Sequence, residues 1–143
     1  MQSAFHIEKK TQDQSVKFSV EFKDHQDINV DNKGLVELVR GPAGMTLIHR
    51  RVYEKLMKDL PHLKMKQKEI ISEEANNYFY NFWDTTFDKD GMWWGEDVHF
   101  CNLLKGAGFK LYGVADGETT HIGNFGWKGK LIDSFKRANG KDS

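Results

Sequence analysis

The stretch Trp93-Trp94-Gly95-Glu96-Asp97-Val98-His99-Phe100-Cys101 organises the rest of this chain. Apolar residues then recur at i, i+3, i+4 and i+7, the spacing of one helix face: Phe100, Leu103, Leu104 and Ala107. Glu96 and Asp97 therefore open a predicted helix, where bare backbone N–H groups and the helix dipole favour ionised carboxylates. Because Asp97 stands at the leading edge of the buried face, we interpret it as a candidate proton acceptor.

An ordinary structural role competes with this interpretation, because acidic residues stabilise helix starts whatever the protein does. The two tryptophans before the acids favour a functional role. Trp93 and Trp94 lie in a predicted loop with the turn residues Asp88, Asp90 and Gly91. Large aromatic side chains in a loop either bury themselves or bind something. Asp88-x-Asp90 itself is better interpreted as a turn than as a metal site.

Length and composition restrict the class of protein. The 143 residues predict one domain over 1–143. The 21 basic and 21 acidic residues balance, so the chain has no net positive charge that would attract nucleic acid. No apolar run is long enough to span a membrane. The single cysteine suits a reducing compartment, and the N-terminus has no signal-peptide pattern, so we expect a cytoplasmic protein.

Periodicity along the chain predicts a mixed α/β, α+β-like domain, a mixed sheet with flanking helices. Strands are predicted at 16–22, 35–39, 78–83, 109–114 and 118–123, the third as a buried aromatic run. Besides the central helix, apolar spacing predicts helices ending before Pro61 and over 131–138. Residues 45–48 are predicted to be buried. The glycine-rich, basic segment 124–130 is predicted to be a flexible loop that can close over an anion.

Two further sets of residues have alternative interpretations. His49, Arg50 and Arg51 stand at a predicted helix start, against the dipole preference, so an anion or acid holds them or they are simply solvated. His121 ends a predicted strand. A lone histidine there is either hydrogen-bonded within the fold or a metal ligand, and no second ligand type stands at ligand spacing next to it.

The order of several motifs resembles one family. The motifs are Gly41-x-x-Gly44-Met45-Thr46-Leu47-Ile48-His49-Arg50-Arg51, an aromatic-Trp83-Asp84, Gly95-Glu96-Asp97-x-x-Phe100-Cys101, Gly108-Phe109-Lys110-Leu111-Tyr112 and His121-Ile122-Gly123. Over about residues 35–123, the chain resembles the C-terminal half of glycosyltransferases with the GT-A fold, especially family-2-like enzymes of bacteria and phages.

The resemblance implies roles for specific residues. Asp97 would be the base that deprotonates the acceptor hydroxyl, with Glu96 beside it, and the reaction would invert configuration. His121 would be a ligand of a divalent metal, Mn²⁺ or Mg²⁺. The residues that would bind substrate are Trp93, Trp94 and Gly95 for the acceptor, Gly44 and Met45 along the cleft, and Trp127 and Lys128 over the diphosphate.

The nucleotide-binding half of such enzymes, with its Asp-x-Asp metal motif, has no counterpart before Leu35. We therefore expect a partial transferase whose partners are a nucleotide-sugar donor and a glycan or other hydroxyl acceptor. Alone, it would have little activity, and its open sheet edge would favour homo-oligomers. The alternatives are a non-catalytic carbohydrate- or protein-binding module derived from that fold, and an unrelated α+β domain in which Glu96, Asp97 and His121 are structural.

Overall fold

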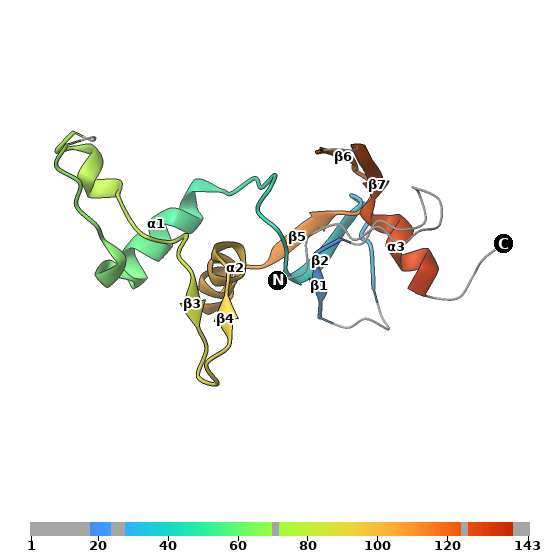
Figure 1. Ribbon diagram of the computed structural model, residues 1–143, viewed down its shortest axis with the longest axis horizontal. Coiled ribbons are helices and arrows are strands. Elements are labelled where there is room, and N and C mark those ends of the chain that lie inside the picture. The colour runs from blue at the N-terminus through green and yellow to red at the C-terminus, as the bar shows by residue number, and fades with distance from the viewer. Residues whose placement is uncertain (1–17, 24–27, 70–71, 124–125, 139–143) are drawn as a thin grey trace. The chain divides into compact units, whose positions relative to one another are not determined.

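The computed structural model describes residues 18–23, 28–69, 72–123 and 126–138, apart from the side chains of residues 127 and 136–138. Within these ranges the fold is mixed α+β, with three small antiparallel sheets and three α-helices (Figure 1). The chain forms two compact units. The terminal unit comprises Met1–Pro42 and Tyr112–Ser143, and the central unit comprises Ala43–Leu111. No helix in the described ranges is long and apolar enough to cross a membrane.

The core of the central unit lies between helices α1 (Arg50–Asp59) and α2 (Glu96–Gly106). Its buried members are Val52, Leu56, Phe82, Phe100 and Leu104. The apolar stripes that predicted both helices therefore supply this core. Cys101 is also buried on α2, with 5% of its surface exposed.

Proline and glycine end the two helices of the central unit. Pro61 begins the short 3₁₀ helix η2 (Pro61–Leu63) directly after α1. At the end of α2, Gly108 adopts a φ of +82°, a conformation that glycine adopts without strain. The N–H of Phe109 donates to the carbonyl of Leu104 at 3.0 Å, and the N–H of Gly108 donates to that of Lys105 at 3.0 Å. This pair of bonds is a Schellman ending.

Between the helices, the chain forms a second 3₁₀ helix and a hairpin. The helix η3 spans Ala75–Tyr78, and strand β3 (Thr86–Phe87) pairs antiparallel with β4 (Trp93–Trp94), which leads into α2 (Figure 1). The register joins Thr86 to Trp94 and Phe87 to Trp93. The hairpin thus fixes the approach of the chain to the first turn of α2.

The terminal unit contains a three-stranded sheet in the order β1 (Glu21–Phe22), β2 (Leu35–Arg40) and β5 (Leu111–Val114). Helix α3 (Leu131–Ala138) packs against this sheet through Leu131 and Phe135. Phe135 meets Phe22 edge to face, with ring centroids 5.2 Å apart. A Cβ on Gly113 would lie 3.2 Å from Leu131 and 3.1 Å from Leu38, so glycine permits this close packing.

A two-stranded hairpin completes the terminal unit. Strand β6 (Glu118–Ile122) pairs antiparallel with β7 (Gly126–Lys130), and every residue of β6 is exposed. The register places Glu118 opposite Lys130 and His121 opposite Trp127. Since neighbouring residues of a strand point to opposite faces, His121 and Lys128 leave opposite faces of the hairpin.

The predicted helices and the strands at 35–39 and 118–123 are confirmed, whereas three other predictions are wrong. Segment 126–130 is strand β7 instead of a loop, because pairing with β6 organises it. Residues 78–83 form no continuous strand, and only Phe82 among them is buried. Met45 and Leu47 are almost fully exposed, although Ile48 packs on the core. Of the strand predicted at 16–22, residues 16–17 lie outside the described ranges, and among residues 18–22 only Glu21–Phe22 is strand.

Candidate functional site

The first turn of α2 carries the two acidic side chains that the sequence singled out. Gly95, which is buried, is the N-cap, and its missing side chain leaves the N-terminal N–H groups without a side-chain cap. Glu96 is exposed and Asp97 is half-buried. The Oδ1 atom of Asp97 accepts from the N–H of Val98 at 2.8 Å. Within the described ranges, its Oδ2 atom has no hydrogen-bond partner, so it can accept a ligand hydroxyl.

The tryptophans of β4 stand on opposite faces of the hairpin. Trp93 keeps 42% of its surface exposed, whereas Trp94 is half-buried and its Nε1–H donates to Oδ2 of Asp88 at 3.0 Å. Trp93 therefore presents a ring to solvent two residues before the N-cap. Trp94 has a structural role in holding the hairpin, and the prediction that it binds substrate remains a prediction.

Asp88 organises the hairpin loop, as the turn interpretation predicted. Its Oδ1 atom accepts from the N–H groups of Asp90 and Met92, both at 2.9 Å. Gly91 follows with a φ of +76°. Both carboxylate oxygens of Asp88 thus accept hydrogen bonds, one from the loop and the other from Trp94. The Asp88-x-Asp90 pair therefore forms a turn.

Trp83 belongs to the same region and was missed by sequence reasoning. It lies in the aromatic run that we predicted to be buried, yet 38% of its surface is exposed. Its ring stacks on Phe100, with centroids 3.9 Å apart and planes inclined by 16°. The sequence offered no signal for this exposure, because a continuous run of aromatic residues predicts burial.

The remaining candidate residues of the central unit lie in the segment before α1 and at the start of that helix. Gly44 and Met45, which the resemblance puts along a cleft, are exposed, Met45 to 93%. His49 caps α1, accepting the N–H of Arg51 at its Nδ1 atom over 3.1 Å. Arg50 pairs with Glu54, Nε to Oε1, at 2.9 Å. An acid on the helix therefore holds one member of the basic cluster.

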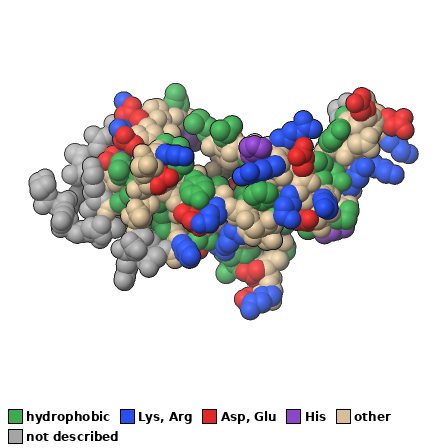
Figure 2. Space-filling view, turned by 180° about the vertical axis from the view of Figure 1, so that it is seen from behind, with side chains coloured by type: hydrophobic (Ala, Val, Ile, Leu, Met, Phe, Trp, Pro, Cys, Tyr) green, Lys and Arg blue, Asp and Glu red, His purple; other side chains and the backbone are tan. Residues whose placement is uncertain are grey.

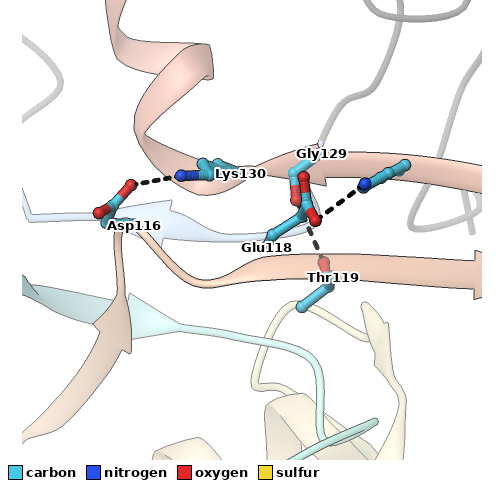
Figure 3. Close-up of polar contacts among 6 residues, drawn as sticks. Asp116, Glu118, Thr119, Gly129 and Lys130 are labelled. Carbon is cyan, nitrogen blue, oxygen red and sulfur yellow. Dashed lines mark hydrogen bonds and ion pairs between the residues drawn. The ribbon is translucent and has the colours of Figure 1, made fainter.

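The β6–β7 hairpin carries the candidate metal ligand and the candidate diphosphate contacts. Lys128 Nζ lies 2.9 Å from Oε1 of Glu118, so an exposed ion pair holds this lysine. Lys130 Nζ donates to Oδ1 of Asp116 at 2.9 Å (Figure 3), and this bond raises the pKa of Lys130. His121 is exposed on the other face. The side chain of Trp127 lies outside the described part of the structure.

The described residues do not by themselves fit a metal ion. Among them, no group of three or more His, Cys, Asp and Glu side chains is arranged to hold one. His121 pairs with Trp127 in the backbone register of the hairpin, and neither tryptophan nor glycine is a metal-ligand residue type. Moreover, Asp97 belongs to the central unit and His121 to the terminal unit, so their common cleft remains a prediction.

The surface charge is mixed. Figure 2 shows acidic, basic and hydrophobic side chains interspersed over the visible face, as the equal numbers of acidic and basic residues lead one to expect. Comparison with known proteins adds no assignment, since no protein-family model, curated protein or solved structure matches this chain.

Proposed function

We propose that this chain is the acceptor-side part of a GT-A glycosyltransferase, and that the central unit binds the acceptor. One observation carries the proposal: the half-buried carboxylate of Asp97, whose Oδ2 atom has no hydrogen-bond partner among the described residues, lies just after the solvent-facing indole of Trp93. An aromatic ring offers the apolar C–H face of a sugar a stacking surface, and a carboxylate accepts a hydrogen bond from its hydroxyl.

In this proposal, Asp97 acts as the general base. Its Oδ2 atom takes the proton of the acceptor hydroxyl while that oxygen forms a bond to the anomeric carbon of the donor. The bond from that carbon to the nucleoside diphosphate breaks, and the diphosphate leaves with the electron pair. Attack opposite the leaving group inverts the configuration. Glu96, turned by about 100° on the helix, would contact another part of the acceptor.

The donor half would come from another polypeptide segment. The resemblance assigns His121 to a divalent metal there, Mn²⁺ or Mg²⁺, but the described residues contain no group of three or more ligand-type side chains that could hold one. The proposal therefore assigns to this chain acceptor binding and proton removal. A nucleotide sugar and Mn²⁺ are expected to give no transfer with this chain alone.

Glycan binding measured by saturation-transfer NMR tests the proposal. The probes are methyl pyranosides of common hexoses, together with analogues that each lack one hydroxyl. A hydrogen bond to a charged group contributes about 1.5–3 kcal/mol, so Asp97→Asn should weaken the best ligand about tenfold or more. The analogue lacking the reacting hydroxyl should bind the original chain and Asp97→Asn equally weakly.

Asp90→Asn is the matched control, because it neutralises an exposed acid at the tip of the same hairpin. It should leave glycan affinity unchanged. If glycans bind and Trp93→Ala abolishes binding while Asp97→Asn does not, the chain is a non-catalytic carbohydrate-binding module. If no glycan binds, the transferase proposal is wrong.

A further inference from the structure

The indole of Trp83 is an exposed ring that the fold holds in one orientation. One side of the ring packs against Phe100, 3.9 Å away between centroids, and Phe100 is itself only 2% exposed. Phe100 in turn contacts Tyr53, with ring centroids 6.0 Å apart. Trp83 is therefore the outermost ring of an aromatic stack rooted in the core, and little ordering is needed when a ligand covers it.

Trp83 lies beside the first turn of α2. Phe100 follows Glu96 and Asp97 by four and three residues, which places all three along one side of the helix. Because side chains on a helix lean toward its N-terminus, the Phe100 ring covers the preceding turn.

The groups around this ring favour an uncharged, hydroxyl-bearing ligand. Asp84 follows Trp83 and is exposed, with its carboxylate accepting from Asn81 Nδ2 at 2.6 Å. With Glu96 and Asp97, three carboxylates therefore belong to this region, and their charge disfavours phosphates and acidic peptides. Sugar hydroxyls donate to carboxylates, and the C–H face of a pyranose covers an indole.

We propose that Trp83 forms a second pyranose subsite, so that the acceptor is an oligosaccharide of at least two rings. Trp93 and Trp83 come from different segments that both reach the first turn of α2. One ring would stack on Trp93 and the next on Trp83. The inference rests on the proposed acceptor-binding function and specifies its substrate class.

Affinities of disaccharides and of the matching methyl monosaccharides, measured by NMR titration, test the subsite. The probes are maltose, cellobiose, lactose and chitobiose. At least one disaccharide should bind about three- to tenfold more tightly than its monosaccharide, the range expected from one aromatic stacking contact. Trp83→Leu keeps apolar contact with Phe100 and should remove this gain, while Trp83→Phe should retain part of it.

Tyr78→Ala is the matched control, because Tyr78 is an aromatic residue of the same unit with 65% of its surface exposed. It should leave the disaccharide gain unchanged. If glycans bind with the Asp97 dependence described above but the gain is absent or unaffected by Trp83→Leu, the second subsite is wrong and the proposed function stands. If no glycan binds, both fail. Binding of tetramethylammonium that Trp83→Leu abolishes would replace the sugar subsite with a cation site.

Discussion

Two aspartates, Asp31 and Asp88, build the same loop in different units. The Oδ1 atom of Asp31 accepts from the N–H groups of Lys33 and Leu35 at 2.8 and 2.9 Å, as that of Asp88 does from the corresponding residues of its loop. In both loops the fourth residue is a glycine with a φ of +76°. Each loop thus depends on an acceptor oxygen at one end and a left-handed residue at the other.

The carboxylate of Asp31 predicts a dependence of stability on pH. The N–H groups of Leu35 and Lys33 lower the pKa of Asp31 below its ordinary 3.8. A lowered pKa in the folded state contributes stability that is complete above the ordinary value and is lost as the pH falls through the folded value. The difference in urea midpoint between the original chain and Asp31→Asn should therefore be larger at pH 6 than at pH 2.5.

The control for this experiment is Glu69→Gln, which removes one negative charge from another exposed side chain. The difference in urea midpoint between Glu69→Gln and the original chain should not be larger at pH 6 than at pH 2.5. Equal differences for Asp31→Asn at pH 6 and pH 2.5 would contradict the proposed role of the two N–H groups.

The elements show how far periodicity specifies this fold. The stripe beginning at Phe100 gives α2 almost to the residue, because the same side chains form the core. Strand β7 contains Gly126 and Gly129 and has no alternation of its own, so its pairing with β6 was not visible. For the candidate site, the sequence predicted Asp97 and Trp93, and their functional roles stay predictions. It did not predict that Trp83 is exposed, because a run of aromatic residues predicts burial and the stacking of Trp83 on Phe100, which covers only one side of its ring, is a tertiary contact.

Helix α1 begins with a weak cap. His49 accepts one N–H, but an imidazole is not among the preferred N-cap side chains, and no acid stands in the first turn. His49→Asp supplies a short acceptor and a negative charge beside Arg50 and Arg51. We expect the free energy of unfolding to rise by about 0.5–1 kcal/mol in urea titrations. His62→Asp, at an exposed position after α1, should change it little, and an equal gain there would contradict a capping effect.

Replacing glycine by alanine should have opposite effects on stability in the loops and in helix α2. A Cβ at Gly34 or Gly91 would meet no atom within 4 Å, so any cost comes from the positive φ alone. Gly34→Ala and Gly91→Ala should each lower the free energy of unfolding by about 1–2 kcal/mol. Gly106 also has open space but an ordinary φ in the last turn of α2, and Gly106→Ala should raise stability by up to about 1 kcal/mol. Urea titrations measure all three, and a common sign would contradict the conformational explanation.

At the scale of the whole molecule, we expect charge balance to govern association. The formal net charge is zero at pH 7, with an isoelectric point near 7.0. Solubility in polyethylene glycol should therefore be lowest near pH 7 and rise at pH 5 and pH 9. Replacing the exposed Lys66 and Lys68 by Glu makes the chain net negative and should move the minimum to lower pH. A minimum that stays in place would mean that apolar surface controls association.

The labelling rate of the single thiol of this chain can measure how often one unit opens. Cys101 is buried on α2, so a thiol reagent such as DTNB can react only after that helix leaves its packing. Its labelling rate in native buffer would report how often the central unit opens, with no signal from the terminal unit. We expect Phe100→Ala to accelerate the reaction strongly and Phe135→Ala, in helix α3, to leave it nearly unchanged.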